Sequence, residues 1–107
     1  MSVSVSIIVP CYNVAAYLDQ CMESLAGQSM EDIEIICVND GSSDRTAEIL
    51  REWRDRDGRV RVIDRKNSGV SAARNSGMEA AAGKYIGFVD PDDVVERNMF
   101  RRLFDAA

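Results

Sequence analysis

Three aspartates crowd into four residues, Asp90, Asp92 and Asp93, directly after an apolar run at 85–89. Carboxylates this close repel one another unless a metal ion, a cationic side chain or helix amides compensate them. Short Asp side chains offer the hard oxygen ligands that Mg²⁺ and Mn²⁺ prefer, and such a metal keeps positions open for the oxygens of a diphosphate. The alternative is structural: Asp92 or Asp93 would cap a helix that begins near Val94.

Two other loops carry polar candidates. Asp40 is either a turn former or the acceptor for a ligand N–H, while Gly41 supplies backbone freedom to the same turn. Asp44 is predicted to be the N-cap of the helix that follows. Arg74 could neutralise a phosphate or bond a base carbonyl, or it could simply pair with Asp40 or Asp90.

The composition is that of a soluble globular domain, with 46% hydrophobic and 29% charged residues in a chain of 107. Lys and Arg number 13 against 18 Asp and Glu, so the net charge is −5 and no nucleic acid partner is expected. The absence of histidine excludes His-based triads, His general bases and His metal ligands. The chemistry must therefore rest on carboxylates, arginine or backbone groups.

Cys11, Cys21 and Cys37 are widely spaced among apolar residues, which fits buried, reduced thiols better than disulfides or a zinc site. No stretch approaches the ~20 apolar residues of a membrane span, and the N-terminus lacks the pattern of a signal peptide. We therefore expect a cytoplasmic domain without a membrane segment, which a longer parent protein could hold at the cytoplasmic face of a membrane.

Four runs rich in β-branched residues alternate with stretches of helical periodicity, and together they form one domain over 1–107. Because parallel neighbours need a crossover that a helix provides, this order predicts an α/β fold with a mostly parallel sheet and helices on both faces. The predicted strands are 3–9, 33–38, 60–63 and 85–89, and the predicted helices are 14–25, 46–53, 70–82 and 94–104.

The candidate residues follow the ends of the predicted strands. In an open parallel sheet, ligands bind in the crevice beyond the carboxyl ends of the strands. This rule brings together the loops at 10–13, 39–44, 64–69 and 90–93. We expect a polar crevice there.

Four motifs in this order resemble those of a known enzyme family. They read VSIIVPCYN at 5–13, VNDGSSD at 38–44, NSG at 67–69 with ARNSG at 73–77, and GKYIGFVDPDD at 83–93. The chain is similar to the N-terminal, nucleotide-sugar-binding half of a family 2 glycosyltransferase, whose GT-A fold has a Rossmann-like nucleotide-binding half.

The resemblance implies inverting transfer of a sugar from a UDP- or TDP-linked donor, with UDP expected, to an acceptor hydroxyl, assisted by Mn²⁺ or Mg²⁺. Asp40 would accept the base N–H, the turn at 10–13 would form a wall for the base, and Asp93 would be the main metal ligand. By the same resemblance the nucleotide-sugar-binding residues are Pro10, Cys11, Tyr12, Asn13, Asp40, Gly69, Arg74, Asp90 and Asp92, and the metal ligands are Asp93 and Asp92.

In this family the catalytic base and the acceptor site lie after the DxD-like motif at 90–93, so we expect them beyond Ala107. This chain would then bind donor and metal but be inactive or only weakly hydrolytic. An open sheet edge could also allow a dimer. The alternative function is a non-catalytic nucleotide-binding or interaction domain. A dinucleotide-dependent oxidoreductase is disfavoured because the turn at 10–13 has no glycine.

Overall fold

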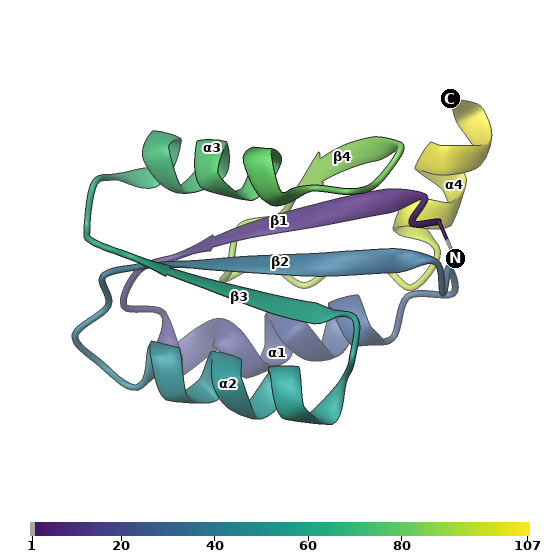
Figure 1. Ribbon diagram of the computed structural model, residues 1–107. Coiled ribbons are helices and arrows are strands. Elements are labelled where there is room, and N and C mark those ends of the chain that lie inside the picture. The colour runs from purple at the N-terminus through teal and green to yellow at the C-terminus, as the bar shows by residue number, and fades with distance from the viewer. Residues whose placement is uncertain (1) are drawn as a thin grey trace.

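Strands and helices alternate along the whole chain in the computed structural model, which describes residues 2–107 (Figure 1). The predicted α/β fold is confirmed. The strands are β1 (Val5–Cys11), β2 (Ile33–Asp40), β3 (Val60–Arg65) and β4 (Tyr85–Phe88), and the helices are α1 (Ala15–Ala26), α2 (Thr46–Arg56), α3 (Val70–Ala80) and α4 (Met99–Ala106).

The four strands form one sheet in the order β3-β2-β1-β4, and every neighbouring pair is parallel. The first two crossovers step away from β1 in one direction, through α1 and α2 on the lower face in Figure 1. The third crossover runs through α3 on the opposite face and places β4 on the other side of β1. The direction of winding thus reverses between β1 and β4, which is where a ligand crevice is expected in such a sheet.

The alternation of side chains along the two central strands divides the core between the two faces. On one face, Ile7 and Ile35 pack with α1 and α2, and on the other, Ile8 and Ile36 pack with α3. Both central strands are buried along their whole length, as expected for a parallel sheet covered on both sides. Gly77 lets α3 approach closely, because a Cβ there would lie 2.5 Å from Cγ2 of Ile8.

Five strand boundaries differ from the prediction, each by one or two residues. The first strand begins at Val5 and continues through Pro10 to Cys11, although proline is uncommon in a central strand. At Pro10 only β2 lies alongside, because the pairing of β1 with β4 ends at Ile8. The missing amide proton therefore costs no ladder hydrogen bond on the β4 side.

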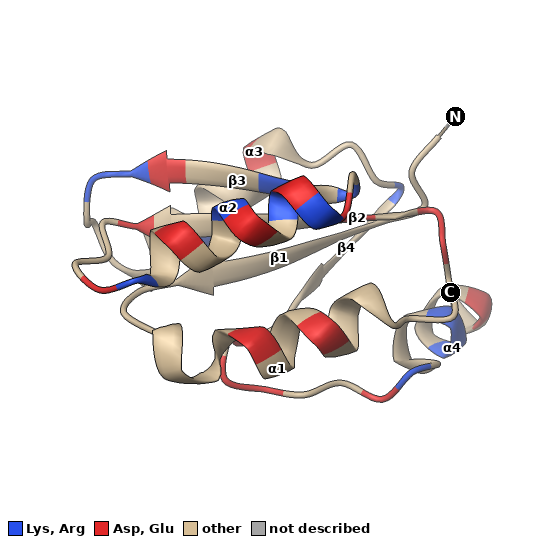
Figure 2. Cartoon of the chain, turned by 90° about the horizontal axis from the view of Figure 1, so that it is seen from below, with Lys and Arg blue, Asp and Glu red and all other residues tan. Residues whose placement is uncertain are grey.

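The predicted helix at 94–104 is wrong in its first turn, because α4 begins only at Met99. The preceding segment runs beside α1 and forms hydrogen bonds with the side chains of Ser24, in that helix, and Gln28, two residues beyond its end (Figure 2). Ser24 Oγ accepts from the amide of Val95 at 3.1 Å, and Gln28 donates to the carbonyl of Glu96 at 2.7 Å. Side-chain partners satisfy this backbone, so it does not need to be helical.

The three cysteines are buried and free, which confirms the prediction of unpaired core thiols. Burial, and then the neighbouring thiols, raise the pKa of Cys37 well above its usual value. Within residues 2–107 there is no helix of the length and apolar character needed to span a membrane.

Candidate functional site

The carboxylates of Asp90, Asp92 and Asp93 gather just beyond the end of β4. All three residues are exposed, and one oxygen from each lies within 4.8 Å of the others. The turn that brings them together is closed by the amide of Asp93, which donates to the carbonyl of Asp90 at 3.0 Å.

The capping interpretation of these aspartates is wrong. The next helix begins at Met99, and its N-cap residue is Asn98. Among the hydrogen bonds of residues 2–107, none has the carboxylate of Asp92 or Asp93 as its acceptor. Helix amides therefore do not compensate this cluster, and its oxygens remain free to bind a hard cation.

Arg74 on α3 is the cation that meets the cluster. Its guanidinium lies 3.8 Å from Oδ1 of Asp90 and 5.9 Å from the centre of the Phe88 ring. Of the two carboxylates considered as its partner, Arg74 pairs with Asp90, whereas Asp40 lies beside Arg65. Arg74 and the cluster share an open groove of about 480 Å³. Its lining residues are Arg74, Phe88, Val89, Asp90, Asp93, Val94, Val95, Glu96 and Met99.

Asp40 is buried at the end of β2, where it holds the loop before α3. Oδ1 accepts from the amide of Ser68 at 3.0 Å and Oδ2 accepts from that of Gly69 at 2.9 Å. The Nε atom of Arg65 lies 3.5 Å from the same carboxylate. The turn after β2 is closed by Asn39, whose Oδ1 accepts from the amide of Ser42 at 3.1 Å, whereas Asp40 holds the neighbouring loop instead of its own turn. Contact with a nucleobase stays a prediction, and a base N–H would share an oxygen that already accepts one amide.

Two glycines permit this arrangement of loops. Gly41 has φ +71°, and a Cβ on it would lie 2.6 Å from the amide nitrogen of Asn67. Gly69 has φ +98° and immediately precedes α3. Both angles lie in the region that favours glycine, so the predicted role of Gly41 in the turn is confirmed.

The loop after β1 presents one side chain prominently to solvent, that of Tyr12, which is 52% exposed. Pro10 and Cys11 are buried, and the Cys11 thiol donates to the carbonyl of Val9. Asn13 is exposed, but its side-chain oxygen accepts from the amide of Ser43 at 2.8 Å. A base resting on this wall would therefore meet the Tyr12 ring and backbone atoms.

Asp44 connects the starts of two helices. Its carboxylate accepts from the amide of Thr46 at 2.9 Å and from that of Ala15 at 3.2 Å. Desolvation opposes its ionisation, but these hydrogen bonds outweigh it and lower the pKa of Asp44. The residue caps α2 as predicted, from one position earlier than the backbone N-cap Arg45. The second contact, to α1, is a tertiary feature that local sequence does not signal.

Cys21, Ser24 and Gln28 are the neighbours of the site that the sequence did not indicate. The Cys21 thiol donates to the carbonyl of Asp90 across 3.6 Å. Burial, followed by the charges of the three aspartates, raises the pKa of Cys21 to about 12, so the thiol stays protonated. Cys21 thus contacts the acidic turn itself, whereas Ser24 and Gln28 hold the residues that follow it, and the three carboxylates stay exposed.

Comparison with known proteins gives a consistent result. The model of the family described as "Glycosyl transferase family 2" matches residues 6–107. "Uncharacterized glycosyltransferase EpsJ" from Bacillus subtilis is 54% identical over 103 residues, which are 96% of this chain and 30% of that protein. "Glycosyltransferase GlyA" from Streptococcus pneumoniae is 43% identical over 100 residues, covering 94% of this chain and 14% of its own length. The chain thus spans less than a third of either relative.

Solved structures show the same architecture. S. aureus TarS 1-349 in complex with UDP-GlcNAc superimposes with a TM-score of 0.88 at 31% identity, over 94% of this chain and 30% of that one. The parallel sheet, its reversal between β1 and β4 and the acidic turn beyond β4 agree with a GT-A fold. Since the family match covers nearly the whole sequence, the chain belongs to glycosyl transferase family 2.

Proposed function

We propose that this chain is the donor-binding part of an inverting glycosyltransferase that takes its sugar from a UDP-linked donor with the help of Mn²⁺ or Mg²⁺. The observation that carries the proposal is the exposed trio of carboxylates that no helix amide compensates, of which Asp90 and Asp93 line one groove together with Arg74. The UDP and UDP-GlcNAc complexes of S. aureus TarS, which is 31% identical to this chain, support a uridine nucleotide.

The donor set fits a divalent metal. Asp93 and Asp92 have no cationic partner among the ion pairs of the described residues, whereas Asp90 already faces Arg74. Asp93, with Asp92, would therefore hold the metal. A bound divalent ion would offset the charge that develops on a departing diphosphate, without any proton transfer. Arg74 places a second positive charge at the same end of the groove.

The nucleoside would lie over the carboxyl ends of β1 and β2. Tyr12 offers an exposed ring there, and Asp40 fixes the amides of Ser68 and Gly69 at the start of α3. Asp40 would take up the base N–H through its remaining acceptor capacity, since each carboxylate oxygen has two lone pairs. The three buried free thiols support a reducing compartment, and we place this site in the cytoplasm.

Acceptor binding and the catalytic base are proposed to lie in residues that the longer relatives carry outside the matched region. By itself the chain would bind donor and metal and hydrolyse the donor slowly at most. A nucleotide-binding domain without catalysis is the second candidate. Besides the acidic cluster, Glu96 is the carboxylate of the described residues that lines the groove, and it is paired with Arg102 at 3.1 Å, which disfavours it as the base for an acceptor.

Ligand-induced stabilisation tests binding. Mn²⁺ together with UDP should raise the Tm of the chain, because a ligand of the native state stabilises it by mass action. Asp93→Ala should remove the metal-dependent part of the shift. Asp55→Ala, a matched change at an exposed carboxylate of α2, should retain it. The absence of a shift with any nucleoside diphosphate at millimolar concentration would rule out the proposed donor site.

Release of UDP separates the enzyme from the binding domain. The chain is incubated with UDP-sugars and Mn²⁺, and free UDP is measured against buffer. Release above the buffer rate that disappears in Asp93→Ala supports the transferase site. Release equal to buffer, combined with a normal thermal shift, supports the non-catalytic candidate.

A further inference from the structure

Arg65, the last residue of β3, is the cation beside the buried carboxylate of Asp40. Its Nε lies 3.5 Å from Oδ1 of Asp40, and the two side chains are 26% and 5% exposed. Among the ion pairs of residues 2–107, no other cation is paired with Asp40. A buried carboxylate is costly unless a positive charge or hydrogen bonds compensate it, so Arg65 stabilises the charge of Asp40.

The contact supplies a charge without occupying an acceptor that a base would need. The buried Nε of Arg65 has no hydrogen-bond partner, so its approach to Asp40 is an ion pair and not a hydrogen bond. Oδ1 of Asp40 accepts one hydrogen bond, from the amide of Ser68. Since a carboxylate oxygen has two lone pairs, Oδ1 keeps one of them beside a positive charge.

The far end of the same guanidinium is fixed on α3. Its Nη1 donates to the carbonyl of Ala72 at 2.8 Å and to the hydroxyl of Ser76. The carboxylate of Asp40 in turn accepts from the two backbone amides immediately before α3. Arg65, Asp40 and the start of α3 are therefore joined into one unit, which restrains the orientation of the carboxylate.

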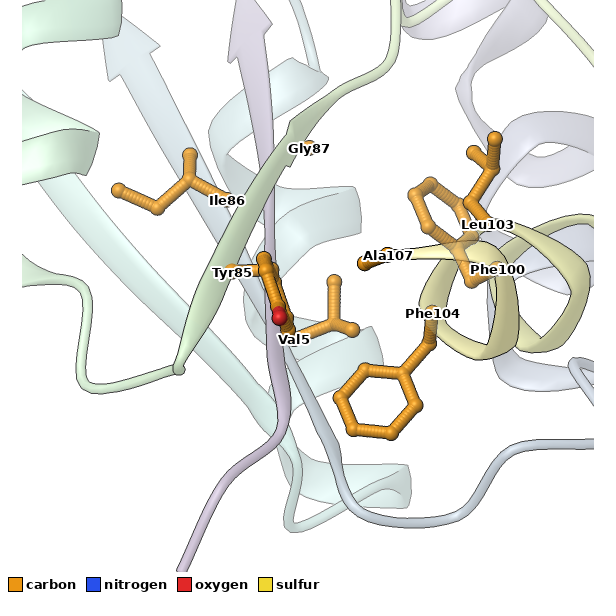
Figure 3. A pocket seen from close by; sticks show the side chains of 8 residues that line it. All are labelled: Val5, Tyr85, Ile86, Gly87, Phe100, Leu103, Phe104 and Ala107. Atoms are coloured by element: carbon orange, nitrogen blue, oxygen red, sulfur yellow. The ribbon is translucent and has the colours of Figure 1, made fainter.

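The apolar hollow beside α4 offers no comparable group. It has a volume of about 200 Å³ and lies next to Val5 at the start of β1, away from the carboxyl ends of the strands (Figure 3). The hydroxyl of Tyr85 is the one polar group among the side chains that line it. A nucleobase has N–H and carbonyl groups along its edge and binds where polar groups are placed to meet them. The unit of Arg65 and Asp40 is therefore better suited to recognise a base.

We propose that Arg65 is a positioning residue for recognition of the donor base, because it fixes the charge and the orientation of the Asp40 carboxylate. This inference rests on the proposed function, in which Asp40 accepts the N–H of uracil. Cytosine carries a lone pair at the same ring nitrogen, which a fixed carboxylate repels. A site built to bond an N–H rejects an analogue that lacks it. Arg65 thus contributes to the selection of uridine over cytidine nucleotides through Asp40.

Isothermal titration of UDP and of CDP, each with Mn²⁺, measures this selection as the ratio of the two affinities. The wild-type chain should bind UDP more tightly. Arg65→Met should lower the ratio on the order of tenfold, because Asp40 loses its cation and its restraint. Arg65→Lys should recover part of the ratio, because the ammonium restores the charge but not the planar fork that α3 holds. Pyrophosphate with Mn²⁺, which has no base, reports separately on the acidic turn.

Arg61→Met is the matched control on the same strand. Arg61 also pairs with a buried carboxylate, that of Glu34 at 2.9 Å, and donates to a carbonyl of α3, that of Ala80 at 2.8 Å. These contacts lie at the other end of the sheet, so Arg61→Met should lower the stability to urea but keep the ratio of UDP to CDP affinity. If Arg65→Met does not fold, Arg65→Gln takes its place in the same comparison.

The outcomes separate this inference from the proposed function. A wild-type chain that binds neither nucleotide overturns both, whereas one that binds UDP and CDP equally overturns the base selection alone. A wild-type preference for UDP that Arg65→Met and Arg61→Met both retain overturns the role of Arg65. Equal losses of UDP, CDP and pyrophosphate in Arg65→Met would show that Arg65 supports the fold of the whole site. Arg65→Lys as unselective as Arg65→Met would overturn the role of the charge.

Discussion

The guanidinium of Arg74 lies 3.8 Å from the carboxylate of Asp90 and above the ring of Phe88. Arg74 comes from α3 and Asp90 from the end of β4, two elements that meet at the reversal of the sheet. One carboxylate of the acidic turn thus has a protein cation, while Asp92 and Asp93 have none among the described residues. The three carboxylates of the acidic turn are therefore not equivalent, and replacing Arg74 tests this difference.

Arg74→Met should change two affinities in opposite directions. Without nucleotide, Mn²⁺ should bind a few-fold more tightly, because the competing cation beside Asp90 is gone. With Mn²⁺ present, UDP should bind roughly tenfold more weakly, because the diphosphate loses a charge-assisted partner. Isothermal titration of each ligand measures both effects.

The control for Arg74→Met is Arg54→Met, which removes an exposed arginine of α2. It should leave both affinities unchanged. If Arg74→Met weakened both ligands equally, the arginine would be supporting the fold of the groove instead of competing with the metal.

Asp40→Asn should destabilise the chain by about 1–3 kcal/mol. The NH2 group of the new side-chain amide would face a backbone N–H, so two donors would meet and that N–H would lose its acceptor. Both oxygens of Asp40 now accept such amides, from Ser68 and Gly69. Urea unfolding measures the loss. Asp55→Asn, at an exposed carboxylate, should change the free energy of unfolding by less than about 0.5 kcal/mol. Equal effects of the two changes would show that the Asp40 contacts contribute little.

The alternation of elements and the parallel sheet could be predicted because they depend on patterns within short windows. Apolar runs such as 33–38 read as buried strands, and the lengths between them admit a crossover helix. The position of the acidic turn at the carboxyl edge followed from the same topology. The pairing of Arg74 with Asp90 was one of two open alternatives, because sequence alone cannot choose between carboxylates of neighbouring loops.

What could not be predicted depends on contacts between distant residues. The segment before Met99 has the composition of a helix start, but Ser24 of α1 and Gln28, just beyond that helix, satisfy its backbone groups. Likewise, nothing near Asp40 in the sequence shows that the amides of Ser68 and Gly69 reach its carboxylate. Side-chain hydrogen bonds to remote backbone override local propensity in both places.

Gly77→Ala should destabilise the chain by about 1–3 kcal/mol, because the new methyl group would overpack the contact between α3 and β1. A Cβ at this position would lie 2.5 Å from Cγ2 of Ile8, which is fully buried. Gly58→Ala is the matched control, since no atom lies within 4 Å of the added Cβ. Urea midpoints of the two variants, and of Gly77→Ala combined with Ile8→Ala, measure the effect. If the destabilisation of the double variant equalled the sum of the two single destabilisations, the added methyl group and the Ile8 side chain would not collide.

Glu34 is buried at the other end of the sheet, where it holds the connection from α3 to β4. Its Oε2 accepts from the Ser6 hydroxyl at 2.6 Å and from the Ala82 amide at 2.7 Å, and its Oε1 accepts from Arg61 at 2.9 Å. Burial opposes ionisation, but these three donors outweigh it and lower the pKa of Glu34 below its usual 4.5. The ionised carboxylate therefore stabilises the position of β4 and, through it, of the acidic turn.

Since the folded-state pKa of Glu34 is the lower one, its contribution is fully present above the unfolded-state value and is lost as pH falls through the folded-state value. Glu34→Gln should cost about 2 kcal/mol near neutral pH, because the buried donors lose a charged acceptor. The difference from wild type should shrink as pH falls below about 4.5. Urea unfolding at a series of pH values measures this, with the exposed Glu48→Gln as control. A difference that stays constant down to acid pH would mean that packing, and not the charge of Glu34, holds the connection to β4.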